Sequence, residues 1–122
     1  MTSINSSDLS VLDLDILTQY TQAIGGQALL GSVDIFEQQF PLYIDNLVAC
    51  LQCGDIKGLT EEAHKMKGAA GAVGLFRLGA LSNKLQNSNH VDWAQCHLDY
   101  IKGIKLYLKS DVDSLREYLL SC

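Results

Sequence analysis

Apolar residues recur at spacings of three and four along nearly the whole of this 122-residue chain. That spacing is typical of amphipathic helices, which bury one face. It predicts five helices. Four of them span residues 14–24, 56–73, 75–86 and 91–120, and the remaining one, second along the chain, starts near Gln27 or Ser32 and ends near Cys53. Four substantial amphipathic helices with short connections predict an all-α fold. We expect an antiparallel four-helix bundle, with the short N-terminal helix lying across one end or side.

Residues that begin or end helices divide this pattern. Asp13 and Asp55 stand before the first and third helices, where a carboxylate can accept hydrogen bonds from free backbone N–H groups. Gly54 is expected to end the second helix, and Gly74 to separate the third from the fourth. Pro41 falls inside the second helix and should kink or divide it, because proline lacks a backbone N–H group.

The third helix carries an unusual polar face. At about 100° per residue, His64, Lys67, Gly68 and Gly71 share one narrow face. The apolar seam of the same helix lies roughly 130° away and consists of Leu59, Ala63, Met66, Ala70 and Val73. The histidine should therefore point away from the core. Each interior glycine costs about 1 kcal/mol relative to alanine, so a partner is expected to approach this face closely.

Composition and length fit a single folded domain. Apolar residues make up 48% of the chain, which is typical of a globular protein. We expect residues 1–12 to form a flexible N-terminus and residues 13–122 to form the bundle. No apolar run approaches the ~20 residues of a membrane span, and the first residues lack the basic and apolar parts of a signal peptide. We therefore expect a cytoplasmic protein without a membrane segment.

The net charge is −5, but its distribution is uneven. Residues 1–56 contain seven acids and no lysine or arginine, whereas residues 57–84 contain five bases and two acids. An acidic chain with one local positive region is a poor candidate for binding nucleic acid, which requires a broad basic surface. The pattern suits a small anionic group or an acidic partner surface.

Four cysteines raise the question of metal or redox chemistry. Cys50 and Cys53 form a CxxC pair, but the βαβ context of a thioredoxin-like motif is absent. A zinc site would have to recruit Cys96, His97 or His90, and no second paired ligand motif exists. The sequence favours the simpler interpretation that the pair consists of small apolar residues near a helix end.

Four interpretations of His64 can be weighed. Acyl-transfer catalysis needs a nucleophile and an orienting acid, and nothing near His64 in sequence supplies them. A metal ion is disfavoured by the neighbouring lysines. Phosphorylation of the imidazole fits, because a neutral ring nitrogen can attack a phosphoryl group and Lys67 lies one turn away. The fourth interpretation is an ordinary solvated histidine beside glycines that pack helices together.

The run HKMKGAAGAVGL, from His64 to Leu75, resembles the histidine-phosphotransfer (Hpt) domain family. The family pattern is His-x-x-Lys-Gly, followed by small residues and a Gly-Leu step. The likeness continues through RLGALSNKLQ to Gln86 and is strongest to the Hpt domains of Arc-type anaerobic hybrid sensor kinases. Nothing in these 122 residues resembles the nucleotide-binding boxes of a kinase or a receiver domain.

The resemblance implies a carrier in a two-component phosphorelay. His64 would accept a phosphoryl group from one receiver-domain aspartate and pass it to another. Lys67 would contact the phosphoryl oxygens, and Gln86 would hydrogen-bond and orient the imidazole. Lys65, Gly68 and Gly71 would lie on the face that docks the receiver.

The partners implied are response-regulator receiver domains and a hybrid sensor kinase. The chain itself would need no cofactor, with magnesium expected on the receiver, and it would act as a monomer without kinase activity of its own. The alternative is a helical adaptor that binds a receiver domain without chemistry. His64 distinguishes the two, because an inactive adaptor would not need a histidine beside Lys67.

Overall fold

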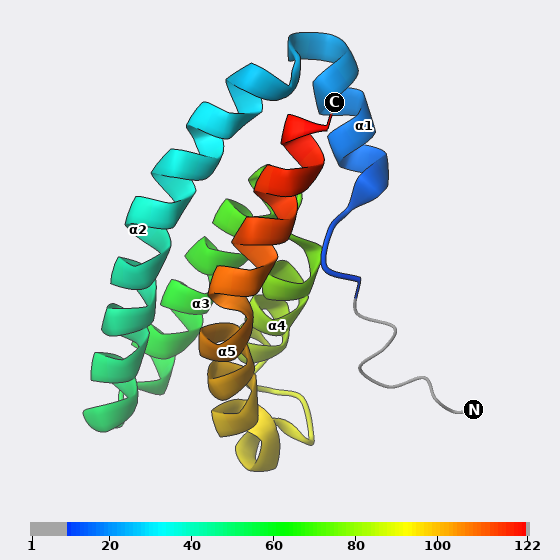
Figure 1. Cartoon of the computed structure of the whole chain (residues 1–122). Helices are drawn as coiled ribbons and strands as arrows, with labels where there is room; N and C mark the ends of the chain where they lie inside the picture. Colours follow the sequence, from blue (N-terminus) through cyan, green and yellow to red (C-terminus); the bar gives the residue numbers. More distant parts are fainter. Residues whose placement is uncertain (1–9, 122) are drawn as a thin grey trace.

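The structure is a computed structural model that describes residues 10–121, in which every regular element is a helix (Figure 1). The five helices are α1 (Leu14–Ile24), α2 (Gly26–Gln52), α3 (Ile56–Ala72), α4 (Phe76–Gln86) and α5 (Trp93–Leu120). Each predicted helix exists, with bounds that differ by at most two residues except at the start of α2. No helix in this part of the chain is both long enough and apolar enough to cross a membrane.

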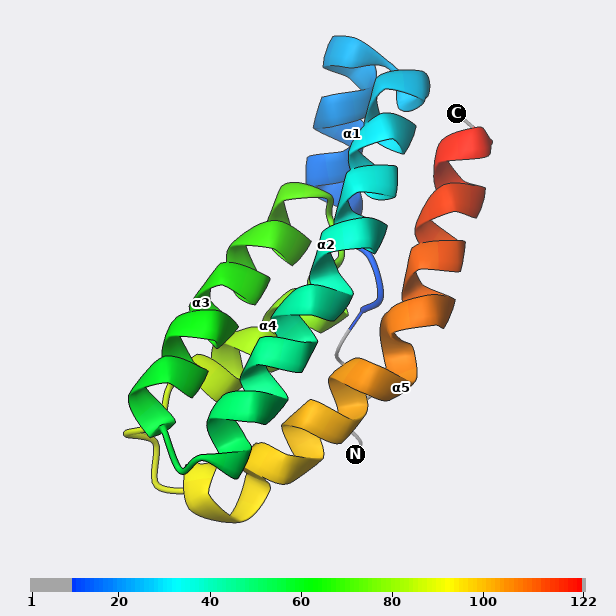
Figure 2. The same cartoon turned by 90° about the vertical axis from the view of Figure 1, so that its left-hand side faces the viewer.

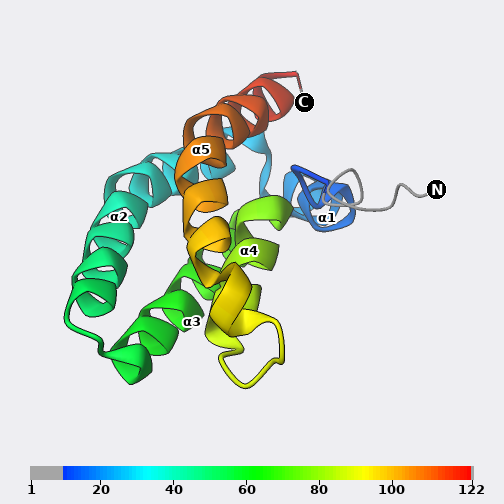
Figure 3. The same cartoon turned by 90° about the horizontal axis from the view of Figure 1, so that it is seen from below.

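Helices α2 to α5 form an antiparallel four-helix bundle, which confirms the predicted fold class. Neighbours along the chain pack together, and α5 closes the bundle against α2 (Figures 1 and 2). Viewed along the bundle, α2 and α3 lie side by side at one edge, and α4 separates α3 from α1 (Figure 3). The phosphotransfer candidate His64 therefore lies on a helix packed between α2 and α4.

The residues that begin helices act as predicted. The Asp13 carboxylate accepts a hydrogen bond from the Ile16 N–H group at 3.2 Å, and the Asp55 carboxylate accepts one from Gly58 at 2.9 Å. Pro41, by contrast, does not divide α2, which runs unbroken from Gly26 to Gln52. Of the two outcomes expected at Pro41, a kink or a division, the division does not occur, because packing of six buried apolar residues along α2 outweighs the loss of one backbone hydrogen bond.

One contiguous core fills the bundle and includes residues from all five helices. The whole predicted seam of α3 is buried, namely Leu59, Ala63, Met66, Ala70 and Val73. Aromatic residues on α2 contribute a stacked pair, Phe36 and Phe40, with ring centroids 4.6 Å apart. The buried seam fixes the rotation of α3 and so determines which of its residues face outward.

Helix α1 covers the end of the bundle where α3 turns into α4. Leu17 is fully buried there and lies against Gly74, whose φ of +75° suits glycine. The Asp13 N–H group donates to the Gly74 carbonyl at 2.9 Å. Of the predicted flexible N-terminus, residues 1–9 lie outside the described part, and Leu12 packs against the core. The short helix therefore lies at one end of the bundle, as expected.

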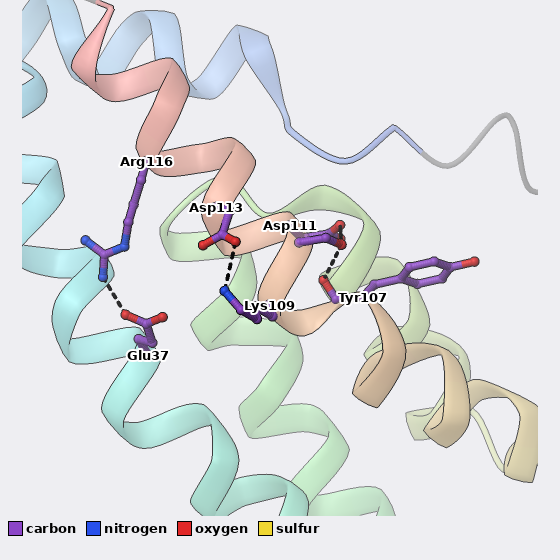
Figure 4. A network of polar contacts seen from close by, with 7 residues as sticks. Glu37, Tyr107, Lys109, Asp111, Asp113 and Arg116 are labelled. Atoms are coloured by element: carbon purple, nitrogen blue, oxygen red, sulfur yellow. Dashed lines mark hydrogen bonds and ion pairs between the residues drawn. The ribbon is translucent and has the colours of Figure 1, made fainter.

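Ion pairs join α5 to two other helices. Arg116 on α5 bonds to Glu37 on α2, a contact visible in Figure 4, and also lies 2.8 Å from Asp34. Arg77 at the start of α4 donates to the buried Asp111 of α5 and lies over the ring of Tyr107, 3.6 Å from its centroid. The Asp111 hydrogen bond raises the pKa of Arg77. These contacts fix the long α5 against both neighbours.

Candidate functional site

His64 is exposed midway along α3, on the side of the helix opposite the core. Its neighbours along the chain, Ala63 and Met66, are fully buried and hold the helix in this orientation. The imidazole is therefore presented to solvent by a rigid element rather than by a loop. An exposed imidazole on a rigid helix can be approached by another protein without rearrangement of the bundle.

Gln86 is the one side chain in the described part of the molecule that bonds to the His64 ring. The two residues are 22 positions apart, and the packing of α4 against α3 brings them together. The His64 Nδ1–H group donates to the Gln86 Oε1 atom at 3.3 Å. An amide oxygen can only accept, so this bond requires the proton on Nδ1. The Nε2 atom is then left with a free lone pair, which is the form a nucleophile needs.

Lys67 is exposed one turn after His64. Three of the five cations in the locally positive stretch have partners elsewhere, because Arg77 pairs with Asp111, Lys84 lies over the Tyr100 ring and Lys65 pairs with Glu62. Lys67 and Lys57 make no ion pair within residues 10–121. The positive stretch is thus not one basic surface, and Lys67 is the cation left available beside His64.

Lys65 pairs with a carboxylate of its own helix. Its ammonium group lies 3.0 Å from the Glu62 Oε1 atom, and this hydrogen bond raises the pKa of Lys65. The other Glu62 oxygen, Oε2, is buried without a hydrogen-bond partner in the part of the chain described. Lys65 and His64 both border an open hollow of about 500 Å³, which Gln86 and Cys50 also line. Lys65 therefore borders the site, but its charge is engaged by Glu62.

Gly68 and Gly71 face open space. A Cβ atom built on either residue would meet nothing within 4 Å beyond the backbone of α3 itself. These glycines consequently do not mediate packing between helices, which was the alternative interpretation of their presence. Lys67 is therefore the one side chain that follows His64 on this face before Gly71, almost two helical turns away.

A second hollow adjoins this glycine surface. It measures about 320 Å³ and lies between α3 and α4, and it is lined by Lys67, Gly71, Leu75, Phe76, Gly79 and Asn83 among others. Phe76, one of the lining residues, is 43% exposed, although phenylalanine is among the residues most often buried. The molecule therefore presents an apolar depression beside Lys67, whereas His64 borders the other hollow.

A family model for the Hpt domain matches residues 31–118. This match spans most of the chain and includes every residue of the site. The chain belongs to the Hpt domain family. The resemblance inferred from the run between His64 and Leu75 is thereby confirmed.

Relatives of this Hpt domain include the aerobic respiration control sensor protein ArcB of Escherichia coli O157:H7 and of Escherichia coli strain K12. Each is 33% identical over 115 residues, which cover 94% of this chain and 15% of the relative. The Hpt domain thus corresponds to a small part of the relatives' length. The histidine-containing phosphotransfer domain of Escherichia coli ArcB superimposes with a TM-score of 0.90 at 32% identity, covering 95% of this chain and 98% of the other.

A solution structure of the same ArcB domain gives a TM-score of 0.84 at 32% identity, covering 98% of this chain and 96% of the other. Two structures of one relative thus share the arrangement of helices seen in this Hpt domain. The family model and both structures therefore agree on the fold of this domain.

The cysteines of this Hpt domain carry free thiols at Cys50, Cys53 and Cys96. Burial raises the pKa of Cys50, and the nearby carboxylates of Asp55 and Glu62 raise it further. A raised pKa lowers the thiolate fraction and so disfavours redox reactivity. Within residues 10–121, no group of three or more His, Cys, Asp or Glu side chains could hold a metal ion.

Sequence reasoning missed the apolar hollow. Phe76, Gly79 and Asn83 follow one another at spacings of three and four on α4, on the side next to Lys67. These three positions form a second face of α4, separate from its leucine seam, and could have been found from their helical spacing. A glycine between an aromatic and an amide residue on one helix face is typical of a shallow hollow rather than of core packing. This face was overlooked because the leucine seam of the same helix is the stronger pattern.

Proposed function

We propose that His64 is the phosphoacceptor of this domain and carries a phosphoryl group between receiver-domain aspartates. The observation that carries this proposal is the bond from His64 Nδ1–H to Gln86. With the proton on Nδ1, the Nε2 atom of this exposed residue would be the nucleophile. Membership of the Hpt family supports the same assignment.

The reaction balances with the groups at this site. The Nε2 lone pair attacks phosphorus, the bond from phosphorus to the receiver's aspartate oxygen breaks, and the aspartate leaves as a carboxylate. Both ring nitrogens then carry a substituent, so the imidazole becomes positively charged. The Gln86 oxygen stabilises this charge through Nδ1–H, and Lys67 stabilises the phosphoryl oxygens. Transfer to the next receiver is the same step in reverse.

The docking face in this proposal consists of Lys65, Gly68 and Gly71 around His64. The open glycines admit the loops that surround the receiver's aspartate, and the apolar hollow beside Lys67 extends the same face. A hybrid sensor kinase and response regulators would supply the receiver domains, and magnesium bound by the receiver would offset negative charge. The domain would act as a monomer in the cytoplasm, where such relays operate.

The domain would not phosphorylate itself from ATP. Its 122 residues contain nothing that resembles a kinase nucleotide-binding box. Positioning of one nucleophile is what this bundle can supply, and most of the catalytic groups would come from the receiver.

Labelling with phosphorylated receiver domains tests the proposal. Receivers from the same cell, carrying radioactive phosphate on aspartate, should label the protein with acid-labile phosphate. His64→Gln should abolish labelling, whereas the control His90→Gln, in the exposed loop before α5, should not change it. If His64→Gln still binds the receiver and the parent protein never becomes labelled, the helical adaptor is the correct function. Label retained on the His64→Gln protein would refute the assignment of the phosphoacceptor.

A further inference from the structure

The position of Gln86 depends on the end of a helix. Gln86 is the last residue of α4, and an irregular loop follows it before α5. The final turn of a helix leaves backbone carbonyls without intrahelical partners and tends to fray. A side chain at such a place is held accurately only when something outside the helix holds the last turn.

The indole of Trp93 provides that support. Its Nε1–H group donates to the Leu85 carbonyl at 2.8 Å, in a buried environment. The neighbouring carbonyls of Lys84 and Gln86 accept from Asn87 and Ser88, which are loop residues. Of these three terminal carbonyls, only that of Leu85 is held by a side chain from another helix. Trp93 itself is 7% exposed and begins α5.

The indole is in turn fixed by His97. The two rings stack with centroids 4.2 Å apart and planes inclined by 7°. The His97 Nδ1–H group donates to the carbonyls of Trp93 and Ala94, at 3.0 and 3.1 Å. The histidine ring is thus anchored to the first turn of α5, and it limits rotation of the indole.

We propose that Trp93 is a positioning residue for phosphotransfer. The Trp93 indole donates a hydrogen bond to the Leu85 carbonyl. Leu85 is the residue directly before Gln86, and the Gln86 side chain accepts a hydrogen bond from His64. Trp93 lines neither the hollow beside His64 nor the hollow beside Lys67. Its effect on the reaction is to keep the Gln86 oxygen on Nδ1–H and so to keep Nε2 unprotonated. This inference rests on the proposed role of His64.

The test uses Trp93→Phe, which keeps an apolar ring to stack on His97 and removes the N–H donor. Nitrogen-15 NMR of the His64 ring reports its tautomer without any transfer reaction. The parent protein should populate the Nδ1–H tautomer predominantly. Trp93→Phe should raise the Nε2–H fraction in the same direction as Gln86→Leu. It should also slow phosphotransfer about fivefold, as expected for the loss of one net hydrogen bond to the ring.

A double variant separates positioning from general destabilisation. Trp93→Phe combined with Gln86→Leu should transfer no more slowly than Gln86→Leu alone, because the indole acts through Gln86. Phe36→Leu is the matched control, since it reduces a buried aromatic on α2 and should lower the melting temperature without moving the His64 tautomer.

Two results would overturn the inference. One is an unchanged tautomer and transfer rate in Trp93→Phe, and the other is an additive loss of rate in the double variant. The failure of the proposed function would be recognised separately, by label retained on His64→Gln. The tautomer measurement tests the role of Trp93 even if His64 does not accept phosphate, because it involves no transfer reaction.

Discussion

The reactivity proposed for His64 depends on two neighbouring residues that act differently. Gln86 orients the ring through a neutral hydrogen bond, whereas Lys67 places a positive charge one turn away. Of the other cations between residues 57 and 84, Lys65, Arg77 and Lys84 are engaged by Glu62, Asp111 and the Tyr100 ring. The remaining one, Lys57, lies about two helical turns before His64. Charge compensation from this chain therefore falls to Lys67.

Replacing Lys67 with alanine should slow phosphotransfer at least about tenfold and leave the fold intact. Charge-assisted hydrogen bonds contribute about 1.5–3 kcal/mol, and this one forms with the phosphoryl oxygens rather than within the bundle. Rates of transfer from a phosphorylated receiver, measured beside the melting temperature, check the expectation. Lys57→Ala, seven residues before His64 on the same helix, is the control and should keep the parent rate. An unchanged rate in Lys67→Ala would mean that the receiver supplies all the neutralising charge.

Substitutions of Gly68 by larger residues test whether the receiver docks at this face. Nothing lies within 4 Å of a Cβ atom at this position, so Gly68→Ala and Gly68→Gln should both fold, and alanine should stabilise the helix slightly. The glutamine side chain would project beside His64 and block the receiver, so transfer should fall strongly in Gly68→Gln. Melting temperature and transfer rate are measured on the same sample. A normally folded Gly68→Gln protein that transfers at the parent rate would show that the receiver docks elsewhere.

At the scale of helices, local signals predicted most of the structure. Asp13 and Asp55 cap helices as expected because capping involves residues only three positions apart. Pro41 alone could not distinguish a kink from a division of α2, since its penalty is local whereas the packing that keeps the helix continuous comes from other helices. Gly74 was identified as a break, but its contact with Leu17 of α1 could not be foreseen across more than fifty residues.

Gly74→Ala should destabilise the fold by at least about 2 kcal/mol. The φ of +75° is costly for a residue with a side chain, and a Cβ atom would lie 2.6 Å from Leu17 Cγ. Gly54→Ala is the matched control, because Gly54 has a similar φ of +71° with nothing within 4 Å. Urea unfolding of both variants separates backbone strain from the clash. Equal losses of unfolding free energy would show that α1 moves away from Gly74 without cost.

At the scale of the whole molecule, the sequence predicted the bundle but not the polar contacts that join its helices. Arg77 and Asp111 are 34 residues apart, and Arg116 and Glu37 are 79 apart, so no local pattern pairs them. In the candidate site, too, local features could be predicted from the sequence and contacts between helices could not. The His-x-x-Lys-Gly face follows from helical spacing within α3, and the family resemblance suggested Gln86, whereas no local pattern indicated the hydrogen bond that Trp93 donates to Leu85. Its donor role depends on how the loop returns α5 to the end of α4.

The buried pair of Arg77 and Asp111 gives a prediction at this scale. Asp111 is 1% exposed, so Arg77→Met should leave an uncompensated carboxylate inside the bundle. Removing one partner of a buried ion pair typically costs about 3–5 kcal/mol. Urea unfolding followed by circular dichroism should show a loss of this size. The exposed pair of Lys109 and Asp113 is the control, and Lys109→Met should change the unfolding free energy by less than about 1 kcal/mol.

The double variant Arg77→Met with Asp111→Leu should recover most of the stability that Arg77→Met loses. Removing both charges also removes the cost of burying them, and the Tyr107 ring beneath the guanidinium can pack against the methionine side chain. Both residues lie outside the docking face, so the double variant should also transfer phosphate at close to the parent rate. A double variant as unstable as Arg77→Met would mean that the pair specifies how α4 meets α5. The His64 tautomer should then shift as well, because α4 carries Gln86.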